Sequence, residues 1–219
     1  LIWREQGIGD ELLFSSCLID LDVLDADITF ECSQRLVSTY ARSFPKFKVQ
    51  PEMINIVDGS NANHEIFDYQ ISLGSILKVL RPDISDFDRQ RPFIKINEIE
   101  KKEFMKRLEL YSDTKLIGIC WRSGTLDPLR NRDYTALKDW KKILNLPGYT
   151  FINLQYGDCE SEIQDLENSC GIKILRWPDL DLKNDLDRVF SLMSCLDCVI
   201  SAPTAVSCMA GSLGLPTLY

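Results

Sequence analysis

The sequence is poor in metal-binding side chains. His64 is the single histidine, and the eight cysteines include one CxxC pair, Cys195 and Cys198, with no second pair at zinc-ribbon spacing. This scarcity argues against a metal site. Most of the cysteines lie within apolar runs, so we expect buried free thiols and no disulfide framework.

Long apolar runs are also missing. No stretch approaches the roughly 20 apolar residues that cross a bilayer. Arg4, Glu5 and Asp10 fall where a signal peptide would be apolar. These observations favour a cytoplasmic protein without a transmembrane segment.

Positive charge is in deficit. The net charge is −8 at pH 7, which argues against a nucleic-acid binder, because such proteins neutralise phosphates with clustered Lys and Arg. With 45% hydrophobic and 26% charged residues, the 219-residue chain has the composition of a soluble globular protein. It is long enough for one large domain or two smaller ones.

Both ends of the sequence are interrupted within predicted structure. The chain has no initiator Met, Leu1 already lies in an apparent strand, and residues 216–219 have the pattern of a new strand. We therefore expect a fragment, truncated at both ends.

Two segments near opposite ends of the chain share a strand-loop-helix pattern. Residues 1–3 lead into 4–10, and residues 198–201 lead into 202–206. In each segment, small or polar residues separate an apolar run from an apolar helical pattern, as where a parallel strand delivers a loop to a helix. The N-terminus of such a helix presents unpaired N–H groups that can bind a phosphate or a carboxylate.

Apolar periodicity predicts a βα series in each half of the chain. A charged, irregular stretch at 81–92 and an amphipathic helix at 99–111 separate the halves. We expect an α/β protein with two Rossmann-like doubly wound domains, at 1–92 and 113–219, joined by a linker helix at 93–112; the second domain is incomplete. The predicted strands are 26–32, 47–49, 67–71, 115–121, 149–155, 173–175 and 198–201, and the predicted helices are 11–19, 34–43, 135–144 and 187–195.

Four blocks of sequence carry a resemblance to bacterial glycosyltransferases: residues 4–11, 117–124, 151–157 and 201–214. In them the chain resembles the heptosyltransferase-like (glycosyltransferase family 9-like) GT-B group, especially the domain found behind tetratricopeptide repeats. That group typically has Ser-x-Asp-Thr-x-x-x-His before Ala-Gly-x-Leu-Gly, whereas Pro203 and Cys208 replace the Asp and the His here.

The resemblance implies two domains that face one another across a cleft. The second domain would bind a nucleoside diphosphate sugar, and the first would bind the acceptor. It further implies transfer without a metal or another cofactor, and an N-terminal repeat domain in the full-length protein.

The first block contains the candidate catalytic residues. The resemblance matches Asp10 to the aspartate that is the candidate base for the acceptor hydroxyl, and one such base is needed on the acceptor side. A helix N-cap is the alternative role for Asp10, and Glu5 is a rival base. Gly7 and Gly9 are expected to serve the turn through positive φ or a close backbone approach.

Three arginines are candidates for the donor phosphates. Arg122 follows a predicted buried strand, and Arg130 and Arg132 lie in the next loop. Arginine stabilises the charge that builds on a departing diphosphate. The resemblance favours a phosphate clamp, and surface salt bridges are the alternative.

Two further segments would complete the donor site. Gln155 and Tyr156 end a predicted strand and are expected to edge a nucleoside pocket, while Trp177 fits either this pocket or a packed corner. Thr204 and Ala205 would offer a hydroxyl and backbone N–H groups to the diphosphate at a helix start.

The leading interpretation is an inverting, metal-independent glycosyltransferase that moves a sugar from a nucleoside diphosphate donor to a carbohydrate, lipid or protein acceptor. Pro203 and Cys208 support an alternative, a non-catalytic sugar-nucleotide-binding or protein-interaction module. A dinucleotide-dependent oxidoreductase is a third hypothesis, but the first loop lacks a third glycine at the usual spacing.

Overall fold

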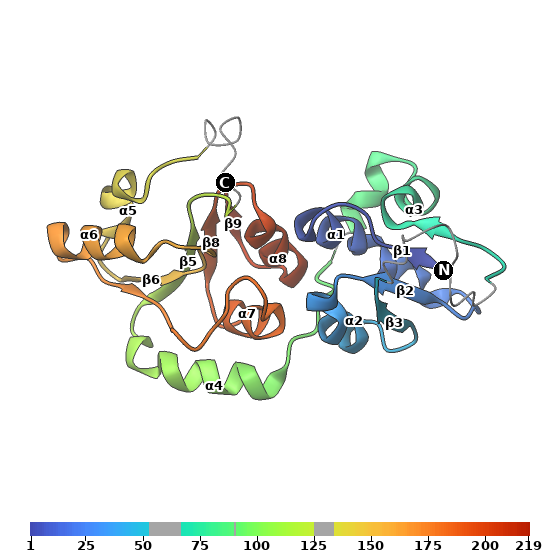
Figure 1. The fold of residues 1–219 in the computed structure, drawn as a ribbon, viewed down its shortest axis with the longest axis horizontal. Helices are drawn as coiled ribbons and strands as arrows, with labels where there is room; N and C mark the ends of the chain where they lie inside the picture. Colours follow the sequence, from blue (N-terminus) through green and yellow to red (C-terminus); the bar gives the residue numbers. More distant parts are fainter. Residues whose placement is uncertain (53–66, 90, 125–133) are drawn as a thin grey trace, which may run out of the picture. The chain divides into compact units, whose positions relative to one another are not determined.

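The computed structural model describes residues 1–52, 67–89, 91–124 and 134–219. The candidate residues Arg130 and Arg132 lie outside these ranges. The chain divides into two compact units, Leu1–Lys95 and Ile96–Tyr219, which can be followed by colour in Figure 1.

The first unit is built on a parallel sheet. Its described strands have the order β3-β2-β1-β4, and Ile2 of the central strand lies opposite Phe30 on one side and Ile71 on the other. Parallel neighbours need crossover connections, which helices supply. The strands are β1 (Ile2–Trp3), β2 (Thr29–Cys32), β3 (Lys48–Pro51) and β4 (Ile71–Ser72), and the helices are α1 (Ile8–Phe14), α2 (Val37–Ser43) and α3 (Leu73–Leu80), with 3₁₀ helices at Ser15–Val23, Gln34–Leu36 and Ile84–Arg89.

An aromatic group forms part of the core of the first unit. The rings of Phe30 and Tyr40 lie 5.1 Å apart, and Phe44 stacks on Phe47 at 5.4 Å and on Phe93 at 6.3 Å. Phe93 belongs to the predicted connection between the halves, but it is buried here. The chain therefore stays packed on the first unit as far as residues 93–95.

The second unit is also built on a parallel sheet, with the order β7-β6-β5-β8-β9 among its described strands. Gly118 of the central strand lies opposite Ile152 and Val199. The strands are β5 (Lys115–Cys120), β6 (Tyr149–Asn153), β7 (Ile174–Leu175), β8 (Cys198–Ser201) and β9 (Thr217–Leu218), and the helices are α4 (Glu98–Leu108), α5 (Lys141–Leu144), α6 (Glu160–Cys170), α7 (Leu186–Met193) and α8 (Ala205–Leu213), with 3₁₀ helices at Glu109–Tyr111 and Leu137–Trp140.

Helices cover both faces of this second sheet. Figure 1 shows α5 and α6 on one side and α7 and α8 on the other. Ile117 and Ile119 of β5 pack in one cluster with Ile163 and Leu166 of α6. Gly118 points to the opposite face, where a Cβ atom would lie 2.5 Å from Leu154 and 2.8 Å from Leu196, so the packing there depends on the absence of a side chain.

The helix expected as a linker belongs to the second unit. Asn97 caps α4 by accepting a hydrogen bond from Ile99 N at 3.0 Å. Arg188 of α7 donates to Glu100 of α4 at 2.9 Å and lies over the ring of Phe104. These contacts pack α4 against α7.

All eight cysteines are free thiols, but only four of them are buried, so the expectation of buried thiols is confirmed in part. Cys17, Cys32, Cys120 and Cys159 are buried, whereas Cys170 is exposed at the end of α6. The described residues contain no group of three metal-ligating side chains. No described helix combines the length and the apolar character that a membrane span requires.

Candidate functional site

Each sheet has a topological switch point, where the order of its strands reverses along the chain. It lies between β1 and β4 in the first unit and between β5 and β8 in the second. Ligands of open α/β sheets bind outside the carboxyl ends of the strands at such points. The two strand-loop-helix segments found in the sequence follow β1 and β8, so each lies at a switch point.

A buried ion pair anchors the loop that follows β1. Glu11 is fully buried, and its carboxylate accepts hydrogen bonds from Arg4 Nε at 2.8 Å and from Ser33 N at 3.0 Å. Arg4 also donates to Glu52 at 2.8 Å and to the Gln6 carbonyl at 2.7 Å. Burial raises the pKa of the Glu11 carboxyl, while Ser33 N–H and Arg4 act in the opposite direction. The pair ties this loop to the end of β2.

The turn in this loop does not take its positive φ from a glycine. Gln6 has φ of 61°, whereas Gly7 has φ of −85° and Gly9 lies inside α1. A Cβ at Gly7 would meet its nearest neighbour, Asp10, at 3.9 Å, which is an ordinary contact. The prediction that a glycine supplies positive φ is therefore wrong, and Gln6 supplies it while Arg4 holds its carbonyl.

The two candidate bases have different surroundings. Glu5 Oε2 accepts a hydrogen bond from Gly74 N, in the first turn of α3, at 2.9 Å. Asp10 is exposed at the third position of α1, whose N-cap is Gly7, so the N-cap alternative for Asp10 is wrong. Within the described part of the chain, no hydrogen bond or ion pair engages the Asp10 carboxylate. It is the freer of the two.

In the second unit, Gln155 links the loops that follow β5 and β6. Gln155 is 1% exposed. Its Oε1 accepts hydrogen bonds from Trp121 N at 3.1 Å and Arg122 N at 3.0 Å, and its Nε2 donates to the carbonyls of Arg122 at 2.9 Å and Tyr156 at 3.0 Å. Because its amide group is used in this way, Gln155 supports the loops and does not present a free polar group to a ligand.

The side chains of Trp121 and Arg122 share one partner on α6. Glu162 accepts from Trp121 Nε1 at 2.9 Å and forms an ion pair with Arg122 Nη2. The same Nη2 donates to the Asp158 carbonyl at 2.8 Å. Arg122, in the loop after β5, is thus held by Asp158, which lies between β6 and α6, and by Glu162 of α6.

Thr204 is the N-cap of α8, and Ala205 is its first residue. Thr204 Oγ1 accepts from Val206 N at 3.3 Å, and Ser207 Oγ accepts from Thr204 N at 3.3 Å. Thr204 Oγ1 also lies 3.6 Å from the buried Sγ of Cys120, at the end of β5. The N-terminus of α8 therefore lies beside the loop that holds Arg122, and the N–H of Ala205 has no helical partner by its position.

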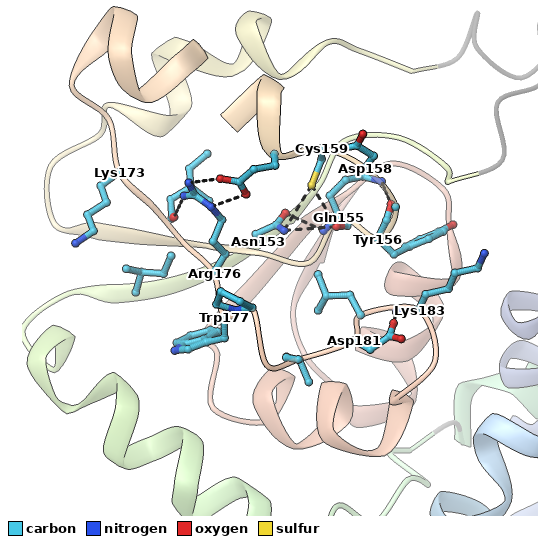
Figure 2. A pocket seen from close by; sticks show the side chains of 17 residues that line it. Asn153, Gln155, Tyr156, Asp158, Cys159, Lys173, Arg176, Trp177, Asp181 and Lys183 are labelled. Atoms are coloured by element: carbon cyan, nitrogen blue, oxygen red, sulfur yellow. Dashed lines mark hydrogen bonds and ion pairs between the residues drawn. The ribbon is translucent and has the colours of Figure 1, made fainter. Parts of the chain in front are cut away.

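A pocket of about 880 Å³ lies beyond the carboxyl ends of β6 and β7. Figure 2 shows Tyr156, Asp158 and Cys159 on one side and Lys173, Arg176 and Trp177 on the other. Asp181 and Lys183 come from the segment before α7.

Tyr156 and Trp177, the two aromatic residues that line this pocket, each pack on a defined neighbour. The ring of Tyr156 packs on Gly124, where a Cβ would lie 2.4 Å from Cε2. Trp177 packs edge-on against Phe104 of α4, with ring centroids 5.9 Å apart. Trp177 is thus both a wall of the pocket and a packed corner, the two roles that the sequence left open.

Sequence reasoning missed two acidic residues that organise these loops. Glu11 lies inside the block that carries the resemblance, and its place among Leu12 and other apolar residues was a signal for a buried, paired carboxylate. Glu162 lies on α6, a helix that was not predicted, so nothing in the sequence pointed to its partners.

No family model matches the sequence. The protein FlbA of Caulobacter vibrioides is 32% identical over 226 residues, which cover 99% of this chain and 38% of FlbA. The chain thus spans less than half the length of this curated relative.

Solved glycosyltransferases share the fold. ADP-heptose lps heptosyltransferase II of E. coli matches with a TM-score of 0.61 and 12% identity, covering 99% of this chain and 82% of that one. The glycosyl transferase family 9 protein of Veillonella parvula matches with a TM-score of 0.68 and 11% identity, covering 99% and 79%. E. coli heptosyltransferase WaaC matches with a TM-score of 0.58 and 13% identity, covering 99% of this chain and 86% of that one.

These matches define the class of fold. The chain has the Rossmann-like α/β architecture with two parallel sheets that is found in the GT-B heptosyltransferases. At such low identity the likeness extends to the fold alone.

Proposed function

We propose that this chain is a glycosyltransferase that binds a nucleoside diphosphate sugar on its second unit. The main support is the pocket of about 880 Å³ at the carboxyl ends of β6 and β7, which adjoins the loop carrying Arg122. Ligand pockets typically measure roughly 300–1,000 Å³. The fold shared with ADP-heptose-using enzymes agrees with such a ligand.

The proposed donor has two parts that fit different groups. The nucleoside would occupy the pocket between Tyr156 and Trp177. The diphosphate would lie near Arg122 and the N-terminus of α8, where the N–H of Ala205 and the partial positive charge of the helix end would face it. In this proposal Arg122 and the helix N-terminus bind the diphosphate without a metal ion.

The proposed reaction is a direct displacement with inversion. The acceptor oxygen forms a bond to the anomeric carbon while the bond from that carbon to the diphosphate oxygen breaks. Asp10 takes the proton of the acceptor hydroxyl, and Arg122 stabilises the negative charge of the departing diphosphate. Asp10 is preferred over Glu5 because Glu5 is already bonded to Gly74 N.

A non-catalytic sugar-nucleotide-binding module is the second candidate. Its support is the replacement of the family's Asp and His by Pro203 and Cys208, which removes a charge and a proton-carrying group next to Thr204. In either case we propose a cytoplasmic role within a longer bacterial protein with tetratricopeptide repeats, and the 38% coverage of FlbA is compatible with additional domains.

Calorimetric titration with nucleoside diphosphates and their sugars tests the proposal. Thr204→Arg should abolish binding by filling the phosphate site, whereas Thr204→Ser, which keeps the capping hydroxyl, should retain it. Ser38→Arg, which adds the same charge to exposed Ser38 of α2, is the matched control. If no nucleotide binds the unaltered chain, the proposal is wrong.

Transfer is then measured as release of the nucleoside diphosphate in the presence of carbohydrate, lipid or protein acceptors. Asp10→Ala should abolish release and leave donor binding unchanged. Binding without release from any acceptor would favour the non-catalytic module.

A further inference from the structure

The side chain of Glu162 makes two directed contacts with the loop after β5. One oxygen accepts from the indole N–H of Trp121, a fully buried side chain, at 2.9 Å. The other oxygen pairs with Arg122 Nη2. The backbone N–H groups of the same two loop residues are held by Gln155. The loop is therefore fixed through its backbone by Gln155, which follows β6, and through its side chains by Glu162 of α6.

Among the described residues, only one nitrogen of the Arg122 guanidinium donates hydrogen bonds. Nη2 donates both to Glu162 and to the Asp158 carbonyl, so its two hydrogens are occupied. Nε and Nη1 make no hydrogen bond to the described residues. No buried side-chain nitrogen or oxygen in the described part lacks a partner, so these two nitrogens are not fully buried. The Arg122 side chain as a whole is 18% exposed.

From this geometry we infer that Glu162 is a positioning residue for the donor diphosphate, because it fixes Arg122 with Nε and Nη1 free to bind phosphate oxygens beside the pocket. The inference deepens the proposed function and depends on it. Arg122 is linked to the pocket through Asp158, which lines it and whose carbonyl accepts the hydrogen bond from Nη2.

For the neutralisation of Glu162, this inference predicts the opposite change in anion affinity from the one that charge alone would cause. Glu162 is a negative charge near a proposed anion site, so its neutralisation should strengthen anion binding if charge alone mattered. If Glu162 positions Arg122, neutralisation instead weakens binding, because the guanidinium loses its fixed geometry. The two readings can be separated by one substitution.

The test is a double-variant cycle with pyrophosphate and the nucleoside diphosphates as ligands, measured by calorimetry. We expect Arg122→Gln to weaken binding about tenfold, as for loss of a charge-assisted hydrogen bond. Glu162→Gln should weaken it several-fold in the unaltered chain and should have no further effect when Arg122 is already Gln. Asp165→Asn, which neutralises an exposed carboxylate on the same helix, is the control and should not weaken binding.

Four results would overturn the inference. Unchanged or tighter binding by Glu162→Gln would show that Glu162 does not position the phosphate contact. Equal weakening by Glu162→Gln with and without Arg122 would indicate a general structural role. Binding that is indifferent to Arg122→Gln would refute the inference and remove Arg122 from the proposed donor site, while donor binding by the second unit would stand. No binding of any of these ligands to the unaltered chain would refute both the inference and the proposed function.

Thermal unfolding of each variant shows whether it is folded. If Glu162→Gln unfolds at the assay temperature, Glu162→Asp replaces it in the cycle. Its carboxylate is one methylene shorter, so it keeps the charge and loses the reach to Arg122, and the same weakening is expected.

Discussion

Glu5 Oε2 and Gly74 N are joined by a hydrogen bond of 2.9 Å across 69 positions of the sequence. The bond connects the loop after β1 with the first turn of α3, on the two sides of the switch point in the first unit. A Cβ at Gly74 would lie 2.8 Å from the same oxygen. The contact gives Glu5 a structural role and leaves Asp10, in the first turn of α1, as the carboxylate without a partner among the described residues.

Alanine variants of these two acids should therefore differ. Glu5→Ala removes an acceptor at a helix N-terminus and should lower the free energy of unfolding by about 1 kcal/mol. Asp10→Ala should change it by less than about 0.5 kcal/mol and abolish sugar transfer. Urea unfolding and the release assay measure the two effects. A catalytically competent Asp10→Ala variant would transfer the role of base to another group.

Glu11→Ala should be strongly destabilising, by about 3 kcal/mol, because it leaves the Arg4 guanidinium and the buried N–H of Ser33 without this acceptor. Glu52→Ala removes the exposed partner of Arg4 and should cost at most about 1 kcal/mol. Urea unfolding of both variants gives the comparison. Equal losses of unfolding free energy in the two variants would contradict the larger structural role of Glu11.

Protonation of Glu11 should make the free energy of unfolding depend on pH. Burial raises its pKa in the folded chain above the ordinary 4.5, so the folded state binds this proton more tightly than the unfolded state does. The contribution of Glu11 to the free energy of unfolding should then increase as pH falls from above the raised pKa towards 4.5. The difference between the unaltered chain and Glu11→Gln, measured by urea unfolding over this range, isolates it; a difference that declines with falling pH would show a lowered pKa.

Gly124→Ala should weaken nucleotide binding. The added methyl would lie 2.4 Å from the ring of Tyr156, so the ring must move from its place at the pocket. Gly211→Ala is the control, because a Cβ there meets nothing within 4 Å, and it should stabilise α8 by about 0.5–1 kcal/mol without affecting binding. Calorimetry and thermal unfolding of both variants provide the measurements. Undiminished binding by Gly124→Ala would place the nucleoside away from Tyr156.

Strands were the most predictable part of the fold. The strand expected at 115–121 is β5 at Lys115–Cys120, and the strand expected at 198–201 is β8 with the same bounds. Both are short apolar runs that are bounded by polar residues, which is the pattern of a buried parallel strand. The helix expected at 11–19 begins earlier, at Ile8, and continues as a 3₁₀ helix from Ser15.

The helix α6 could not be predicted in the same way. It buries only Ile163 and Leu166 among its eleven residues, and its N-cap, Cys159, makes no side-chain capping bond. Its apolar signal is therefore weak, and its stop signal, Gly171 with φ of 68°, stood without a clear start.

The contacts of the candidate site were less predictable than its position. The carboxyl ends of β1 and β8 were expected to carry the functional loops, and both loops lie at switch points. The sequence did not indicate that Arg122 meets a carboxylate 40 positions later, or that Gln155 is buried with its amide bonded to the backbone. Such pairs depend on tertiary packing, which local periodicity does not encode.

The distribution of the free thiols makes the chain suitable for selective labelling. Burial raises the pKa of Cys17 and of Cys120 to about 11, which suppresses their reactive thiolates. Cys170 is exposed, and hydrogen bonds from Ser169 and Lys141 lower its pKa. A maleimide dye used at mildly acidic pH should attach first to Cys170, at the end of the helix that carries Glu162. The fluorescence of this dye would then be an optical signal for ligand binding at Arg122.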